Sequence, residues 1–450
     1  MRSGAVWIAS FATLLIAGAP AVRGLRNLSL ATRAVLGAAV ASVVLSTWMT
    51  LFSLVGLLWN VPVLLLVTLI ASIGLGRLLE AGPDPAAKRP SSLTGADRWL
   101  WTGAVLLSAA GVAVAALSVI AGASTSGDFI MFWGPKAQVF ALTRTIDARI
   151  FRDPSLGYLH PSYPPFVTNL DAFATMLAGR MAWGAATATF PLLLAALALA
   201  LPGLLRATAA EPTASAAAAL VVSGIGLVGM EADIAGNGEM PLLLFETLAM
   251  ALLVRRDAAK PSMQLLAGIL LAGVASTKVE GLPFVIATAL LFPALRRDVP
   301  GKLCAALRLF LPTAVTLGAW FAFGARSGLF RGYEGYGRFL TIYPAIFPRV
   351  AASVGYFLWG IGYATPFLFP LVFLALRPRP WRPALLPLGI GATLCAFFLF
   401  TYLHDQNPHM WIGWSAARIF SPLIPLLAIA GCAGTADSAP EATGPGRAAR

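Results

Sequence analysis

Apolar runs of about 15 to 27 residues, almost free of charged side chains, recur along the whole 450-residue chain. A helix needs about 20 consecutive apolar residues to cross the hydrocarbon core of a bilayer. The pattern therefore predicts an all-α fold, a polytopic transmembrane helical bundle of about 13 spans. The expected spans are residues 4–22, 34–58, 61–77, 98–121, 184–204, 213–230, 240–254, 262–276, 281–295, 303–324, 350–376, 383–402 and 418–434.

Two stretches leave the topology open. Residues 164–181 are amphipathic and carry Asp171 and Arg180, so we interpret them as a re-entrant or interfacial helix. A spanning helix there would reverse every later assignment of a connection to one face of the membrane.

The first run, "MRSGAVWIASFATLLIAGAPAV", also has the basic start and small-residue end of a signal peptide. Its cleavage would place Asp128 in the cytoplasm, and the basic connections between the runs argue against that.

The composition agrees with a membrane protein, because only 11% of the residues are charged, against about 25% in ordinary soluble domains. The net charge of +13 arises mostly from basic residues in alternate connections between the apolar runs. This is the positive-inside pattern of cytoplasmic loops, so we expect no nucleic-acid partner and assign the other connections to the outer face. The basic connections contain Arg23, Arg26, Arg33, Arg77, Lys88, Arg89, Arg98, Arg206, Arg255, Arg256, Arg296, Arg297 and residues 377–382.

The connections that are predicted to face outward carry many polar residues. The first, about residues 122–163, contains Asp128 and Lys136 in "SGDFIMFWGPKAQVF" and His160 and Tyr163 in "HPSYPPF". All three histidines of the protein lie on this predicted face. The later outward connections add Glu239, Lys278, Glu280, Arg326, Arg331, Arg338, His404, His409 and Arg418.

The turn that holds Lys278 and Glu280 is predicted to lie below the outer surface. Its flanking apolar runs have about 15 residues each, which gives helices of about 22 Å against a hydrocarbon core of about 30 Å. The run at 240–254 is equally short, so Glu239 should lie at a similar depth. Charged residues at that depth line a cavity inside the protein rather than face lipid.

Each of these features also has a purely structural interpretation. Asp128 would cap a helix that starts at the membrane edge, and Lys278 and Glu280 would pair only with each other. The three cysteines have neither disulfide nor metal-site spacing, and no histidine has metal-ligand spacing. Tryptophans near the membrane edge would form an interfacial belt; these are Trp133, Trp411 and Trp414.

At these residues the sequence resembles the GT-C superfamily of integral membrane glycosyltransferases, near the protein mannosyltransferases and the lipid A aminoarabinose transferases. "GDFIMFWGPKAQVF" is similar to the family's first outward loop, where a Trp-Lys-Ala stretch follows an aspartate. "HPSYPPF" resembles its His-Pro-Tyr-Pro-Pro run, and "STKVEGLPF" resembles a Thr-Lys-x-Glu-Gly stretch. "HMWIGWSAARIFSPLIP" resembles the last outward loop.

The resemblance implies a catalytic core at residues 98–434 with a GT-C-like outward-facing cavity. Extra transmembrane segments in 1–97 would precede it, and a disordered cytoplasmic tail in 435–450 would follow it. The implied activity is an inverting hexosyl- or pentosyltransferase in the bacterial inner membrane, which moves a sugar from a polyprenyl-phosphate carrier to a glycan, lipid or protein acceptor. Many members have a second acid within two residues of the first, but Phe129 and Ile130 follow Asp128 here. A divalent metal is therefore only a weak expectation, and no other cofactor is implied.

The chemistry of such a transfer assigns roles to the polar residues. A carboxylate takes the acceptor's proton, and cations stabilise the departing phosphate. Two other functions stay open: a transporter or flippase for a lipid-linked or anionic solute, which usually has repeated halves, and a non-catalytic scaffold subunit. We expect Asp128 to be the catalytic base and the substrate to be bound by Lys136, His160, Tyr163, Glu239, Lys278, Glu280, Arg326, Arg331, Arg338, His404 and Arg418.

Overall fold

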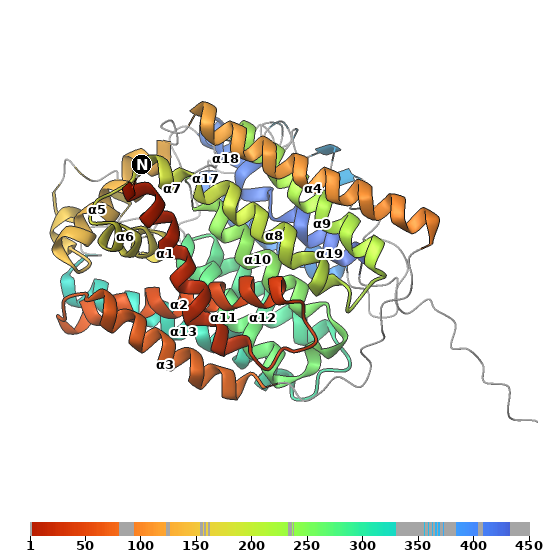
Figure 1. Ribbon diagram of the computed structural model, residues 1–450, viewed down its shortest axis with the longest axis horizontal. Coiled ribbons are helices and arrows are strands. Elements are labelled where there is room, and N and C mark those ends of the chain that lie inside the picture. Colours follow the sequence, from red (N-terminus) through yellow and green to blue (C-terminus); the bar gives the residue numbers. More distant parts are fainter. Residues whose placement is uncertain are drawn as a thin grey trace, which may run out of the picture.

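Every regular element in the part of the chain that the computed structural model describes is a helix (Figure 1). The predicted span at 350–376 falls almost entirely outside this part, and the predicted tail at 435–450 falls outside it completely. The described part comprises residues 2–80, 94–122, 127–153, 163–232, 238–329, 384–403 and 408–432, with 156, 159, 160, 236, 355, 359, 362, 365, 366, 368, 369 and 372.

Eight helical stretches among the described residues are long and apolar enough to cross a membrane. Each overlaps a span expected from the sequence, and together they indicate a membrane protein. The stretches are formed by α1 (Arg2–Gly18) with η1 (Ala19–Val22), α2 (Leu30–Val55), α3 (Val61–Leu78), α4 (Gly95–Gly122), α7 (Trp183–Thr187) with α8 (Thr189–Leu205), α9 (Glu211–Ala232), α13 (Lys302–Ser327), and α18 (Pro408–Phe420) with α19 (Leu423–Cys432).

Three consecutive helices are as short as the sequence predicts. They are α10 (Glu239–Leu253), α11 (Pro261–Thr277) and α12 (Gly281–Leu295), with 15, 17 and 15 residues. At 1.5 Å per residue they measure roughly 22 to 26 Å, less than the hydrocarbon thickness of about 30 Å. The remaining long helix near the C-terminus is α17 (Leu385–Leu403).

The turn between α11 and α12 lies below the end of its neighbour α13. Ser276 Oγ of α11 lies 3.1 Å from Thr316 Oγ1 of α13, which puts these two residues at one level. Helix α13 then continues to Ser327, roughly 16 Å further along its axis. The polar residues after Thr277 therefore sit within the bundle rather than at its rim.

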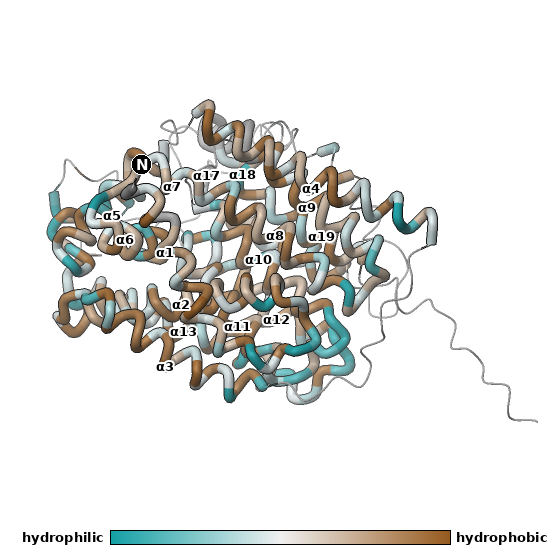
Figure 2. Tube along the Cα trace, viewed as in Figure 1, coloured by the Kyte–Doolittle hydropathy of each residue, from teal (hydrophilic) through white to brown (hydrophobic). Residues whose placement is uncertain are grey.

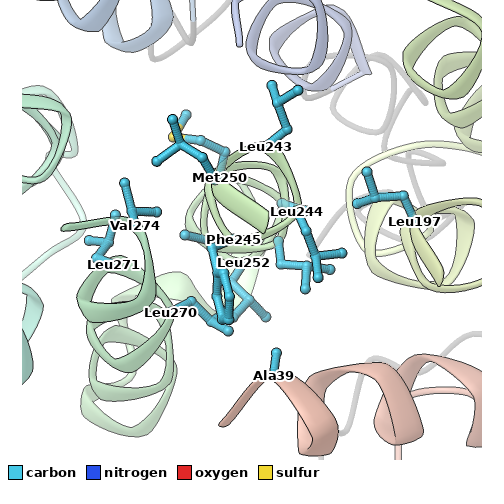
Figure 3. Close-up of a cluster of buried hydrophobic side chains, with 14 of the residues drawn as sticks. Ala39, Leu197, Leu243, Leu244, Phe245, Met250, Leu252, Leu270, Leu271 and Val274 are labelled. Carbon is cyan, nitrogen blue, oxygen red and sulfur yellow. The ribbon is translucent and has the colours of Figure 1, made fainter. Parts of the chain in front are cut away.

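Helix α10 lies within the bundle and is buried on almost every side. All of its residues from Glu239 to Leu253 except Pro241 are buried. Figure 3 shows its apolar side chains against Leu197 of α8, Leu271 of α11 and Ala39 of α2. A helix that is hydrophobic all round belongs in the core. The carboxylate of Glu239 at its start must therefore be paired within the protein.

Local signals set the ends of the helices around this core. The backbone N–H of Thr32 donates to Ser29 Oγ at the start of α2, over 3.1 Å. Helix α2 ends at Gly56, whose φ of 81° is the left-handed conformation that glycine adopts easily. Val63 N–H donates to Asn60 Oδ1 at the start of α3, over 3.2 Å. Serine and asparagine are preferred N-caps, so a short capped turn joins α2 to α3.

Basic connections that are predicted to share one side of the membrane meet in the structure. Arg255 binds Asp257 through two hydrogen bonds of 2.8 and 3.0 Å. Arg296 binds Asp298 in the same way and also donates to the carbonyl oxygen of Arg255 over 3.3 Å. Figure 2 shows hydrophilic residues gathered in these connections, after α10 and after α12. They lie at the end of α10 that is opposite to Glu239.

The structure bears on two segments for which the sequence made specific predictions, residues 164–181, expected not to span, and the helix expected at 418–434. Residues 164–181 form α6 (Phe166–Ala178), whose 13 residues are too few to span a bilayer and pack against α1, α2 and α5 (Gly134–Thr143). The helix expected at 418–434 is interrupted at Ser421 and Pro422, because proline has no N–H for the helical hydrogen bond. Arg418 therefore lies in the last turn of α18, ahead of this interruption.

The N-terminal segments at 1–97 are not packed as a separate unit. Helix α2 contacts α8, α11 and α13, and α1 contacts α6. Leu36 and Val40 of α2 belong to the same buried apolar cluster as Ile424 of α19. The three N-terminal helices therefore share one hydrophobic core with the later helices.

The two ends of α10 lead to a prediction about topology. Arg152, in the connection after α5, and Arg256, after α10, are both exposed. In a background without Cys304, Cys395 and Cys432, a membrane-impermeant maleimide on intact cells should label Arg152→Cys and should label Arg256→Cys only after lysis. The reverse result would invert the assignment of faces.

Candidate functional site

Asp128 opens a π-helical turn, η2 (Phe129–Trp133), that leads directly into α5. Such turns are rare and often occur at functional sites. The Asp128 side chain makes no capping hydrogen bond to this turn. The interpretation of Asp128 as a helix cap is therefore wrong. Its carboxylate points instead toward α18, where Arg418 Nη1 lies 3.3 Å from Asp128 Oδ2.

Five charged residues from four separate segments form one connected group, which we call the ion chain. Arg418 Nη1 lies 3.3 Å from both Asp128 Oδ2 and Glu239 Oε1. Lys278 Nζ lies 2.7 Å from the same Glu239 oxygen and 3.4 Å from Glu280 Oε1. The ion chain thus links the segment that opens η2, the start of α10, the turn between α11 and α12, and α18. The purely structural interpretation of that turn, in which Lys278 and Glu280 pair only with each other, is therefore wrong, because Lys278 also binds Glu239.

Three stacked rings border the ion chain, and we call them the aromatic stack: Trp133, Tyr163 and His160. The Trp133 and Tyr163 rings stack with centroids 5.7 Å apart, and those of Tyr163 and His160 with centroids 4.9 Å apart. Lys278 Nζ lies 6.0 Å from the Tyr163 ring, and Lys136 Nζ lies 4.5 Å from the Trp133 ring. Both lysines are within the range of a cation–π interaction.

The position of Trp133 corrects one sequence interpretation. Its side chain is 0% exposed and is enclosed by protein, so Trp133 is not an interfacial belt residue. The next residue, Gly134, allows the close approach of Trp183 to this turn, because a Cβ on Gly134 would lie 2.2 Å from the Trp183 ring. The side chains of Trp411 and Trp414 fall outside the described part of the chain.

The "HPSYPPF" run holds the aromatic stack against the core. His160 has a φ of 47°, an uncommon conformation for a residue with a side chain. Its ring contacts Phe132 edge-on, with centroids 4.9 Å apart. At the other end of the run, Phe166 contacts Phe245 of α10 edge-on, with centroids 5.3 Å apart. The run is therefore fixed at both ends, with Tyr163 between them facing Lys278.

Burial changes the protonation of the groups around the site. Burial raises the pKa of Asp128, and the Glu239 carboxylate raises it further, against the opposing effects of Lys278 and Arg418. Burial also lowers the pKa of Lys136 to about 7. Burial, with Lys136 and Lys278 nearby, lowers the pKa of His160 to about 4. His160 is therefore a neutral ring at physiological pH, and its role is not that of a cation.

The other predicted site residues lie elsewhere or outside the described residues. Arg326 is exposed at the end of α13 and donates to the carbonyl oxygen of Leu54 on α2 over 2.5 Å. It lies ten residues, roughly 15 Å, beyond the level of Thr316 and Ser276.

The described residues contain no group of three His, Cys, Asp or Glu side chains placed to hold a metal ion. Arg331, Arg338 and His404 fall outside the described part, as does the side chain of His409.

Sequence reasoning missed two members of the site. Trp133 was assigned to a membrane belt although it lies five residues after Asp128 in one helical stretch. Gly238 packs between Trp133 and Lys278, since a Cβ on it would lie 3.4 Å from Trp133 Cζ2 and 3.2 Å from Lys278 Cδ. A glycine directly before a buried glutamate is the only sequence signal for this close approach.

Comparison of the chain with models of known protein families, with curated proteins and with solved structures found no match in any of the three. The resemblance to the GT-C superfamily therefore stays a prediction from the sequence motifs.

The Glu239–Lys278 pair should matter strongly for stability. Lys278→Met removes one partner of a buried ion pair, which typically costs about 3–5 kcal/mol. We expect the free energy of unfolding, measured by denaturant titration in detergent, to fall by an amount of this order. The double variant Glu239→Gln/Lys278→Met should lose less than the sum of the two single variants.

The pair Arg149–Asp147 provides a matched control. Its ion-pair distance is also 2.7 Å, but the Arg149 side chain is 79% exposed. The Asp147 side chain is 9% exposed, but it also accepts the backbone N–H of Arg149, which the substitution keeps. A pair whose cation is exposed is screened by water and contributes little, so Arg149→Met should leave unfolding nearly unchanged. Equal effects of Arg149→Met and Lys278→Met would show that the ion chain is not a structural constraint.

Proposed function

We propose that this protein is a membrane glycosyltransferase of the GT-C type, with about 13 spans and an outward-facing cavity. It would transfer a sugar from a polyprenyl-phosphate carrier to an acceptor. The observation that carries the proposal is the ion chain. Asp128, Lys278, Glu280 and Arg418 come from three of the four stretches that carry the resemblance, and Glu239 joins them into one group by contacting both Lys278 and Arg418.

Exposure distinguishes among the three carboxylates of the ion chain. The Asp128 side chain is 24% exposed, whereas those of Glu239 and Glu280 are 2% and 10% exposed. Only Asp128 is therefore well placed to meet an acceptor from outside. Its raised pKa makes its ionised form a stronger base than an ordinary aspartate. We assign the proton transfer from the acceptor hydroxyl to Asp128 and a supporting role to Glu239 and Glu280.

The charge of the ion chain limits where a phosphate binds. The chain contains three carboxylates and two cations, a net charge of −1, and both cations already contact carboxylates. A phosphate group would be repelled by this excess unless further cations accompany it. Lys136, with its pKa of about 7, supplies only part of a charge. We therefore assign the main phosphate contacts to Arg331 and Arg338, whose guanidinium groups suit bidentate binding.

The second candidate function is a transporter or flippase, and one observation favours it. Glu246 lies in the middle of α10, 1% exposed, and its Oε2 has no hydrogen-bond partner among the described residues. Buried acids inside spanning helices often relay protons in transporters. Purified protein in liposomes separates the two functions. A transporter would move a lipid-linked solute across the bilayer without releasing free carrier phosphate.

The reacting carboxylate is tested by Asp128→Asn. This change keeps the size of the side chain but removes the basic oxygen, and positioned general-base catalysis contributes about 10²–10⁴-fold. Release of carrier phosphate from polyprenyl-phosphate sugars should fall by about that factor, with carrier affinity retained. Asp147→Asn, in the same loop, is the matched control and should turn over normally. Near-normal transfer by Asp128→Asn would move the search to Glu239 and Glu280.

The same assignment predicts the pH dependence of transfer. The base works in its ionised form, which is lost as the pH falls through its pKa. Because the pKa of Asp128 is raised, the acid limb of the rate profile should lie above the pH expected for an ordinary aspartate, about 3.9. The Asp128→Asn variant should lack this limb. A limb at the ordinary value in the wild type would argue against Asp128 as the base.

The phosphate contacts are tested by Arg331→Gln and Arg338→Gln. Loss of a hydrogen bond to a charged group costs about 1.5–3 kcal/mol, or roughly ten- to 150-fold in affinity for the carrier. Arg152→Gln is the matched control, because Arg152 is exposed and donates to the carbonyl oxygen of Ser327 at the same end of the molecule. Unchanged affinity of the double variant Arg331→Gln/Arg338→Gln would place the phosphate elsewhere.

A further inference from the structure

Two buried polar atoms beside the ion chain have no hydrogen-bond partner among the described residues. They are the indole Nε1 of Trp133 and the carboxylate Oε2 of Glu239. Both side chains are almost completely enclosed, at 0% and 2% exposed. Native proteins leave few such atoms unsatisfied, and those that remain often mark a bound water or ligand.

The two atoms belong to one small region. Trp133 Cζ2, two bonds from Nε1 in the indole, lies against Gly238, the residue before Glu239. Lys278 also packs against Gly238 and binds Glu239 Oε1 over 2.7 Å. Tyr163 stacks on Trp133 and faces Lys278. The unsatisfied donor and the unsatisfied acceptor therefore flank the same backbone segment.

The chemistry of these atoms selects the ligand. An indole N–H only donates, and an ionised carboxylate only accepts. A phosphate oxygen suits Trp133 but is repelled by Glu239. A hydroxyl group accepts one hydrogen bond and donates another, so it satisfies both atoms. A sugar ring offers several hydroxyls, whereas the polyprenyl chain offers none.

We infer that Trp133 Nε1–H and Glu239 Oε2 bind hydroxyl groups of the sugar that the lipid phosphate carries, an inference that rests on the proposed function. Both groups are held before the sugar arrives: stacking on Tyr163 fixes Trp133, and Lys278 and Arg418 fix Glu239 through its other oxygen. Preorganisation of this kind reduces the cost of binding. Arg418 joins Glu239 to Asp128, so the sugar site adjoins the reacting carboxylate.

The test compares two lipids and two variants. Undecaprenyl phosphate and the same lipid carrying a hexose or a pentose would be titrated into the purified protein. Trp133→Phe should weaken binding of the sugar-loaded lipid about two- to thirteenfold, the range that one net hydrogen bond gives, and should leave the bare lipid phosphate unchanged. Trp59→Phe is the matched control, because Trp59 is equally buried but donates to the Met49 carbonyl oxygen over 2.8 Å. Trp59→Phe should bind both lipids like the wild type.

A second measurement begins with the wild-type protein, in which its result does not depend on how Trp133→Phe folds. Sugar-loaded lipids in which one ring hydroxyl at a time is replaced by hydrogen should include at least one that binds more weakly than its parent. In Trp133→Phe that same replacement should cost less, because the hydrogen bond is already lost.

The outcomes separate the two proposals. Equal weakening of both lipids by Trp133→Phe, or a deoxy series that binds like its parent, would overturn the inference and assign the two atoms to bound water. The proposed function would survive that result. A wild-type protein that binds neither lipid would overturn the proposed function, and the inference would fall with it.

Discussion

The contact between Glu239 and Lys278 is the constraint on which the arrangement of the site depends. Glu239 begins a helix that is buried on almost every side, so its carboxylate is shielded from bulk water and must be neutralised by protein. Lys278 and Arg418 both approach the same oxygen, Oε1. Arg418 then reaches Asp128. The need to pair one buried carboxylate thus fixes the first outward loop, α10, α18 and the turn between α11 and α12 relative to one another.

Helix length decides which cations join this group. Helices α11 and α13 pack in parallel, since Gly268 meets Arg308 and Ser276 meets Thr316 at the same offset in residue number. Helix α11 ends one residue after Ser276, which delivers Lys278 to the depth of Glu239. Helix α13 runs on for more than two further turns, so Arg326 is carried away to the carbonyl oxygen of Leu54.

Apolar lengths were sufficient to predict most helices, because about 20 apolar residues are a physical requirement for crossing a bilayer. The gathering of outward residues at one end also followed, since consecutive helices that alternate in direction bring alternate loops together. The sequence did not predict which side chains pair with one another at that end. Nothing in the sequence says that the Asp128 carboxylate meets Arg418 instead of a backbone N–H, or that Trp133 faces inward, because both depend on how α18 and α7 pack against the first loop. The relative depths of Lys278 and Arg326 follow from counting residues along α11 and α13. This count requires a known contact between the two helices, such as Ser276 with Thr316.

The charges around the site divide it into two sides. On one side, the ion chain has more carboxylates than cations and contains Asp128, the acid that solvent reaches most easily. On the other, the aromatic stack carries His160 in its neutral form and places Lys136 over Trp133. An acceptor hydroxyl gains from the first side, where a base is needed. A departing phosphate is not stabilised on that side, because its growing negative charge would face an excess of carboxylates. A transferase built on this frame must therefore bring positive charge from outside the ion chain, and we propose Arg331 and Arg338, which follow α13 in the sequence, for this role.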